Sequence, residues 1–163
     1  MKFVLYFAGF FFSAPAFSQD ITGVWTGFLE TNGTRLPYEL AISRNDEKFS
    51  GYSLTTFTIE GVENKGLKSM KIKNRNGKIT IEDNDLVQDN YSTNPKRVML
   101  WSSLSLLTND TVWVLTGPFN SRAYNNPGYK GTIHLRKNRN QREGELMARL
   151  EKLDLLYTLS FLP

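Results

Sequence analysis

The chain has 163 residues, a formal net charge of +4 and no cysteine. This length suits one domain with a buried core, and without disulfides its stability must come from apolar burial and backbone hydrogen bonds. The basic residues are interspersed with acidic ones except around 65–78 and 130–142, so we expect no nucleic-acid partner, although weak attraction to anionic lipid or polysaccharide remains an alternative.

The N-terminal segment has the order of a signal peptide. A basic residue precedes an apolar block over Phe3–Phe12, and Ala16-Phe17-Ser18 supplies the small residues that a signal peptidase recognises before Gln19. The apolar run is about half the length that a membrane-spanning helix needs. We therefore expect residues 1–18 to be a signal peptide and 19–163 to be a single domain. The mature chain, without an integral membrane span, is then exported, as a periplasmic or secreted protein.

The first half of the domain consists of short β-type runs separated by turns. The run over 21–30 leads into Asn32-Gly33, a pair suited to the positive φ angles of a tight hairpin. Apolar and polar residues alternate over 36–43, and Asn76-Gly77 marks a second hairpin. Further strands are expected at 49–58, 67–74 and 79–83, where Ile79, Ile81 and Asp83 share one face.

The second half continues the same pattern. The polar stretches 88–96 and 120–128 are predicted to be loops, and strands are expected at 98–107, 111–116 and 129–136. The sequence thus predicts an all-β fold, a single antiparallel up-and-down barrel of eight strands. An outer-membrane barrel has the same alternation, but the charged strand faces and the helical pattern near the C-terminus argue against it.

The period changes after residue 142. Leu146, Met147, Leu150 and Leu153 recur at helical spacing with charged residues between them, which predicts one amphipathic helix over about 142–154. Its apolar stripe is expected to pack on the outside of the barrel. Residues 157–162 alternate again, which predicts a short strand or a docked tail.

The beginning of the first strand resembles that of the calycin barrels. Gly23-Val24-Trp25 is similar to the Gly-x-Trp motif of lipocalins, and the run over 21–26 with Phe49-Ser50-Gly51-Tyr52 downstream looks like the opening of avidins. The resemblance implies that Trp25 is a structural plug at the closed end of the barrel. The overall pattern is also similar to exported β-proteins of Gram-negative bacteria, which implies the cell envelope.

Two departures limit this resemblance. Avidins have a biotin-contacting asparagine where this chain has Gly27, so biotin is not the expected ligand. Lipocalins often place an arginine of the last strand across the tryptophan, a role that Arg136 could take. Strand alternation instead points Ile133 and Leu135 inward and Arg136 outward.

No catalytic or metal-binding pattern is present in the sequence. His134 is the single histidine and cysteine is absent, so we expect no catalytic triad, no metal site, no cofactor and no enzymatic activity. The acidic residues at 82, 83, 85 and 89 lack the spacing of an EF-hand calcium loop. Glu39, Glu60 and the carboxylates at 82 and 83 offer no selected pair for glycoside hydrolysis.

Aromatic residues are the remaining candidates for a binding site, because they can either line a barrel cavity or fill it. The candidates are Tyr38, Tyr52, Phe57, Trp101 and Trp113. The expected function is non-catalytic binding of a small apolar molecule in a cavity whose mouth is bordered by 88–96 and 120–128. The alternative is a structural or accessory protein with a filled barrel, whose exposed apolar patch contacts another envelope protein.

Overall fold

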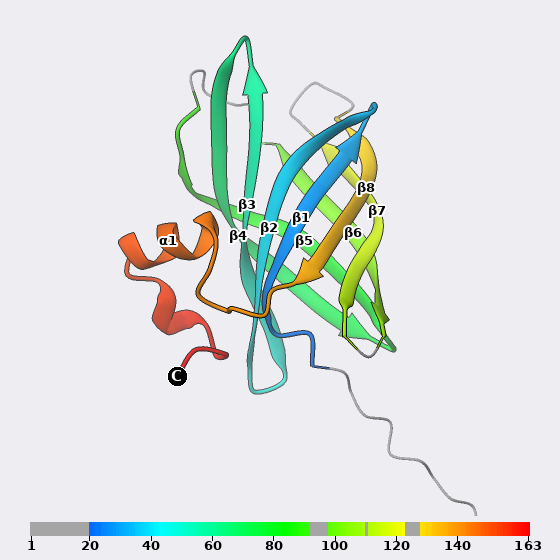
Figure 1. Cartoon of the computed structure of the whole chain (residues 1–163), viewed down its shortest axis with the longest axis vertical. Coiled ribbons are helices and arrows are strands. Elements are labelled where there is room, and N and C mark those ends of the chain that lie inside the picture. Colours follow the sequence, from blue (N-terminus) through cyan, green and yellow to red (C-terminus); the bar gives the residue numbers. More distant parts are fainter. Residues whose placement is uncertain (1–19, 92–97, 110, 123–127) are drawn as a thin grey trace, which may run out of the picture.

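The computed structural model describes residues 20–91, 98–109, 111–122 and 128–163, and it forms a closed antiparallel barrel (Figure 1). Each strand pairs with the next in sequence, and the last strand pairs with the first to close the wall. The strands are β1 (Gly23–Thr31), β2 (Thr34–Asn45), β3 (Lys48–Ile59), β4 (Val62–Arg75), β5 (Lys78–Asp89), β6 (Met99–Thr108), β7 (Trp113–Arg122) and β8 (Lys130–Lys137). The predicted eight-stranded up-and-down barrel is confirmed, and its plan is consistent with a calycin-like fold.

Some segments with sequence-based predictions lie outside the described residues. These are the signal peptide at 1–18 and, within the two predicted loops, 92–96 and 123–127. The described flanks show that both loops begin later than expected, because β5 continues to Asp89 and β7 to Arg122. Polar residues extend β5 since Gln88 and Asp89 still pair with Leu67 and Gly66 of β4.

The tight hairpins have the backbone that their sequences predict. Asn32 and Gly33 have φ of 50° and 75°, and Asn76 and Gly77 have φ of 51° and 77°. Two consecutive positive φ angles are those of a type I′ turn, whose twist matches that of the strands it joins. Glu60 and Gly61 turn the chain between β3 and β4 in the same way, at 50° and 79°.

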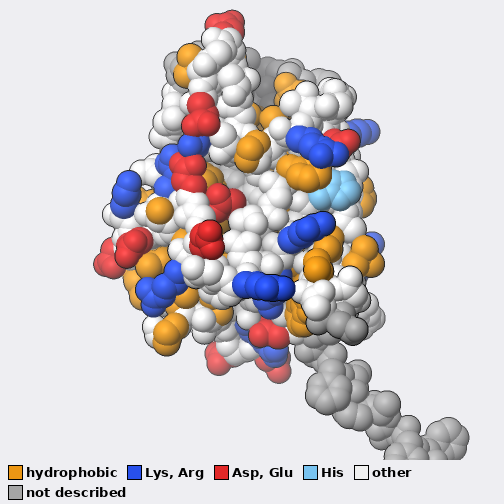
Figure 2. All heavy atoms as spheres, viewed as in Figure 1, with side chains coloured by type: hydrophobic (Ala, Val, Ile, Leu, Met, Phe, Trp, Pro, Cys, Tyr) orange, Lys and Arg blue, Asp and Glu red, His pale blue; other side chains and the backbone are white. Residues whose placement is uncertain are grey.

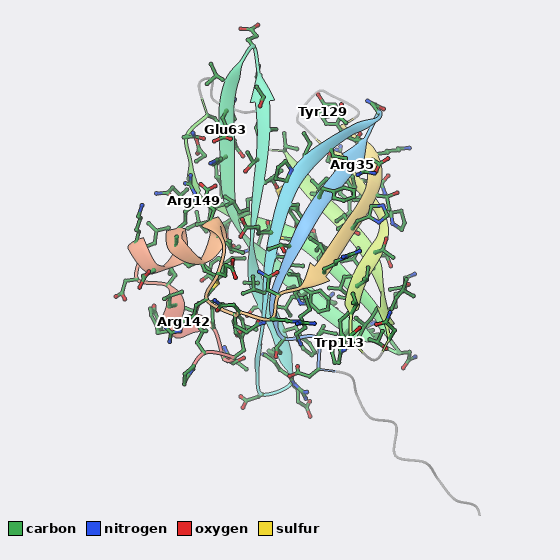
Figure 3. All side chains as sticks on the ribbon, in the orientation of Figure 1. Arg35, Glu63, Trp113, Tyr129, Arg142 and Arg149 are labelled. Atoms are coloured by element: carbon green, nitrogen blue, oxygen red, sulfur yellow. The ribbon has the colours of Figure 1, made fainter. Side chains whose placement is uncertain are left out.

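The two ends of the barrel differ. The closed end carries the beginning of β1 and the Asn76-Gly77 hairpin, whereas the mouth carries the Asn32-Gly33 and Glu60-Gly61 hairpins. Figure 3 shows Trp113 at the closed end, with Arg35 and Tyr129 at the mouth. Apolar side chains fill most of the interior, and β3 contributes only partly buried ones to it, such as Phe49. The buried members are Ile21, Trp25, Leu29, Tyr38, Leu40, Ile42, Met70, Ile72, Ile79, Ile81, Leu100, Leu104, Leu115, Phe119, Ile133 and Leu135.

Trp25 belongs to the apolar cluster in the interior of the barrel. Its side chain is fully buried, and its indole N–H donates to the Ile21 carbonyl at 3.0 Å. Arg136 points outward and the adjacent Lys137, which is opposite Trp25 in the register, places its ammonium 5.6 Å from the Trp25 ring. The same ammonium lies 4.6 Å from the ring of Trp113. The cation beside the tryptophan is therefore a lysine, one position beyond the arginine considered from the sequence.

The predicted helix is present and packs outside the barrel. Helix α1 (Glu145–Lys152) and the short 3-10 helix η1 (Leu156–Thr158) lie beside β2 and β3, on the side opposite β6 and β7 (Figure 1). The expected tail therefore docks as a helical turn. A second apolar cluster joins α1 and the tail to the barrel wall. Its buried members are Val24, Ala41, Leu54, Leu67, Leu146, Met147, Leu150 and Leu159. Within the described part of the chain, no helix combines the length and the apolar character required to cross a bilayer.

Glu39 of β2 connects the wall to the beginning of α1. Its two carboxylate oxygens accept hydrogen bonds from the backbone N–H groups of Glu145 and Leu146, at 3.3 and 3.0 Å. Gly144, at φ 119°, leaves the room for this contact, because a Cβ there would lie 2.5 Å from a Glu39 oxygen. A side chain distant in sequence thus satisfies two of the N–H groups that every helix leaves unpaired at its N-terminus.

Replacement of Glu39 by glutamine is expected to have a pH-dependent effect on stability. Burial raises the pKa of Glu39 above its ordinary value of 4.5, despite the two backbone donors and Lys65. The stabilisation from a raised pKa is fully present below the ordinary value and is lost as the pH rises through the folded-state value. The unmodified protein should therefore exceed Glu39→Gln in free energy of unfolding by an amount that shrinks from about pH 4 to about pH 7, a range that starts near the ordinary pKa. Urea unfolding at several pH values measures this difference. An advantage that grows with pH would contradict this assignment.

Candidate functional site

A charged pair lies inside the mouth half of the barrel. Strand alternation points Lys68 of β4 and Asp83 of β5 inward, and their side chains form an ion pair in which only 3% of the Asp83 side chain is exposed. The Lys68 ammonium also donates to the Val98 carbonyl at 2.7 Å. The backbone N–H of Leu100 donates to Asp83 Oδ2 at 2.9 Å, so strands β4, β5 and β6 all contribute to the pair.

Burial dominates the electrostatics of this pair. It raises the pKa of the Asp83 carboxyl above its ordinary value, even though Lys68 and the Leu100 N–H both favour the ionised form. Charges removed from water are costly unless they are well paired and hydrogen-bonded. Lys68 and Asp83 therefore add little to the net stability of the fold, and their position in the interior needs another reason.

Tyr38 of β2 lies beside the pair with its hydroxyl unsatisfied. Only 1% of the residue is exposed, and the hydroxyl oxygen has no hydrogen-bond partner among the described residues. Burial, and then the negative charge of Asp83, raise the pKa of this phenol. Ser53 lies close enough to Tyr38 to oppose the rise of this pKa. The Ser53 hydroxyl donates to the Met70 sulfur at 3.2 Å, however, and the Ser53 and Tyr38 hydroxyls do not have hydrogen-bond geometry. The phenol is thus a polar atom in the interior that packing alone does not explain.

Tyr91 covers this group on the mouth side. Its ring lies 5.4 Å from the ring of Phe57, and a Cβ at Gly66 would come within 1.8 Å of its hydroxyl oxygen. Burial, followed by the charges of Asp89 and Asp83, raises the pKa of Tyr91 to about 12. The absence of a side chain at position 66 therefore lets a tyrosine enter the barrel above the ion pair.

We call Tyr38, Ser53, Lys68, Asp83 and Tyr91 the buried polar group. Of these five, only Tyr38 is among the site residues expected from the sequence. Lys68 and Asp83 carried a usable signal, because each is a charged residue in phase with the inward-facing Met70, Ile72, Ile79 and Ile81. Nothing in the sequence around Tyr91 indicates that its side chain turns inward.

The structure separates the other aromatic candidates. Phe57 faces inward at the mouth beside Tyr91, and Trp113 packs against the interior cluster at the closed end. Tyr52 and Trp101 lie on the outer face of the wall, Tyr52 under the C-terminal tail and Trp101 43% exposed to solvent. Neither lines the interior, because the alternation along β3 and β6 gives inward positions to Ser53 and to Leu100 and Ser102 instead.

The polar residues considered for chemistry are distributed over different faces. Asp83 points inward while the adjacent Glu82 points outward, and Glu39 binds the beginning of α1. Among the described residues, no three or more histidine or acidic side chains converge as metal ligands would. His134 lies outside the barrel, its ring 5.2 Å from that of Phe28, where Figure 2 shows the histidine among apolar and basic side chains.

Two half-open hollows lie over the outer face of the wall. The first, of about 670 Å³, extends over β3 and β4 between the β2–β3 hairpin and Thr158. The second, of about 560 Å³, extends over β4 to β7 around Trp101. On the mouth side of the buried polar group, the rings of Phe57 and Tyr91 instead pack against each other.

Comparison of the chain with family models, with curated proteins and with solved structures finds no match. The barrel plan, the buried polar group and the two outer hollows are therefore the basis for the functional argument.

Proposed function

We propose that this is an exported, non-catalytic binding protein that holds a small, mainly apolar molecule in the mouth half of its barrel. The observation that carries the proposal is the Tyr38 hydroxyl, which is buried without a partner beside a buried ion pair. An unsatisfied buried hydroxyl destabilises a fold by about 1–3 kcal/mol, a cost that a ligand atom would remove by accepting or donating a hydrogen bond. Inward-facing apolar residues such as Leu29 and Phe119 supply the surroundings for the rest of the molecule.

Access to this site requires Tyr91 to move. Tyr91 and Phe57 close the mouth side of the buried polar group, and the Tyr91 side chain is held by ring packing and by its fit against Gly66. A ligand that replaces the tyrosine would meet Tyr38 and the Lys68–Asp83 pair. The signal-peptide order of residues 1–18 supports export to the periplasm or the exterior, and the Gly-x-Trp resemblance to lipocalins supports binding within the barrel.

Removal of the Tyr38 hydroxyl provides the first test. Tyr38→Phe is expected to increase the free energy of unfolding of the ligand-free protein by about 1 kcal/mol, because it deletes an unsatisfied buried group and keeps the ring. Tyr52→Phe is the matched control, since the Tyr52 hydroxyl accepts a hydrogen bond from Thr158 at 3.4 Å on the outer face. That variant should be neutral or slightly destabilised in urea unfolding. Destabilisation by Tyr38→Phe would show that the phenol is already satisfied.

Native mass spectrometry of the purified protein tests binding directly. A co-isolated small molecule is expected on the unmodified protein and on Tyr52→Phe, and its occupancy should fall in Tyr38→Phe. Repeated absence of any bound species, with an unchanged mass after incubation with fatty acids or isoprenoids, would overturn the proposal.

The second candidate is a structural or accessory protein with a filled barrel. It is favoured by the apolar side chains that occupy most of the interior and by the position of both hollows on the outer wall. Ile59 and Val62, about half exposed at the tip of the β3–β4 hairpin, would then belong to the contact surface. Replacement of both residues by alanine should abolish recovery of an envelope partner by cross-linking. In native mass spectrometry, the amount of any bound small molecule should stay the same as in the unmodified protein.

A further inference from the structure

The outer wall carries an aromatic groove that the interior site does not use. Trp101 of β6 lies 43% exposed in a hollow of about 560 Å³. Strand β6 lies on the side of the barrel opposite α1 (Figure 1). The register places Trp101 between Glu82 of β5 and Asn120 of β7. Thr80 adds a hydroxyl group to the same lining. A large flat ring is therefore surrounded by side chains that can exchange hydrogen bonds with a polar ligand.

The charge of this wall is strongly one-sided. Lys71 and Lys73 line the groove, and Lys71 faces Glu82 in the β4–β5 register, yet these residues form no ion pair with each other. Over residues 69–84 and strands β6 and β7, the outward-facing charged side chains are five cations and one carboxylate. They are Lys71, Lys73, Arg75, Lys78 and Arg122 against Glu82. The structure thus gathers basic residues that are dispersed in the sequence, and such a surface attracts an anionic ligand.

The shape of the wall favours a chain-like ligand. Lys71 and Lys73 line both outer hollows, so the hollow over β3 and β4 and the groove around Trp101 are neighbours that meet at β4. A path from Thr158 to Asn120 therefore crosses β3 to β7 with the two lysines at its middle. A small anion would occupy only one of these hollows, whereas a linear polymer can occupy both.

We propose that this wall, defined by Trp101, Lys71, Lys73 and Glu82, binds an acidic polysaccharide. The Trp101 ring stacks on the face of one sugar, the lysines pair with carboxylates of the chain, and Glu82 accepts hydrogen bonds from sugar hydroxyls. Glu82 favours a sugar chain over a DNA strand, because a carboxylate only accepts hydrogen bonds, and the sugars of a polysaccharide offer it free hydroxyl donors that internal deoxyriboses lack. A bilayer surface is disfavoured because Trp101 lies in a concave site, where a broad membrane surface cannot reach it.

The test is titration of the purified protein by calorimetry and tryptophan fluorescence. The probes are a galacturonate octamer, an uncharged malto-octaose, a thymidine octamer and vesicles with anionic lipid. We expect the galacturonate octamer to bind, with affinity that falls as salt rises. Trp101→Ala should weaken this binding at least about tenfold, the scale of a lost stacking contact, and Lys71→Gln with Lys73→Gln should weaken it similarly and remove most of the salt dependence.

Matched variants separate the groove from general effects. Leu107→Ala removes another exposed apolar side chain on the outer face of β6, and Arg142→Gln with Lys152→Gln makes the same change in net charge on the α1 side of the barrel, at residues that line neither hollow. Both should bind galacturonate within about twofold of the unmodified protein, as expected for distant independent sites. Equal binding of malto-octaose, tighter binding of the thymidine octamer, co-sedimentation with vesicles alone, or no binding of any probe would each overturn the proposal.

Discussion

Asp83→Ala is expected to lower the free energy of unfolding by about 3–5 kcal/mol, the range measured when one partner of a buried ion pair is removed. The variant leaves Lys68 inside the barrel with only the Val98 carbonyl as a described partner, and it leaves the Leu100 N–H without its acceptor. Urea unfolding followed by tryptophan fluorescence gives the measurement. A loss below about 1 kcal/mol, within the range of ordinary surface substitutions, would show that water satisfies this region.

The paired replacement separates the cost of an orphaned charge from the value of the pair. Lys68→Met with Asp83→Leu removes both charges and keeps apolar volume in the interior. Such replacements are often neutral or stabilising, so the double variant is expected to be more stable than Asp83→Ala by at least about 2 kcal/mol. A double variant as unstable as the single one would mean that the ion pair itself holds β4, β5 and β6 together.

This comparison also bears on function. If the pair can be replaced without loss of stability, the fold does not require charge at positions 68 and 83. The role of the buried polar group is then ligand binding and not stability. The double variant should then fold and lose the co-isolated molecule proposed above. A stable double variant that keeps the molecule would place the ligand elsewhere in the barrel.

The barrel was predictable because its determinants are local. Asn32-Gly33 and Asn76-Gly77 specify turns whose backbone was known in advance, and the alternation between them specifies which residues face inward. The apolar period at Leu146, Met147 and Leu150 likewise specified the helix and the face that it buries. Each of these features needs only neighbouring residues to be recognised.

The candidate site was less predictable because it depends on contacts between distant strands. Trp101 and Tyr52 were selected as aromatic residues, and only the phase of β6 and β3 decides that they face outward. Tyr91 enters the barrel because Gly66, on a different strand, leaves room for its hydroxyl. The basic wall around Lys71 is likewise a property of the closed sheet, since its cations come from β4, β5 and β7.

Trp25→Ala is expected to be among the most destabilising single substitutions in this chain, by about 3–5 kcal/mol, the range for loss of a large buried aromatic ring. Trp25 is fully buried among apolar residues at the closed end, and its loss would open a cavity beneath Lys137, whose ammonium lies 5.6 Å from the ring. Desolvation lowers the pKa of Lys137, so this cation is already poorly hydrated and would lose an aromatic neighbour.

Trp101→Ala is the matched control. It removes the same indole ring at a position that is 43% exposed. It should change the free energy of unfolding by no more than about 1 kcal/mol, because a partly exposed ring leaves no closed cavity when it is removed. Chemical unfolding of the two variants side by side therefore separates a tryptophan that builds the barrel from one that is free to bind. Equal losses in the two variants would contradict both the plug assigned to Trp25 and the open groove assigned to Trp101.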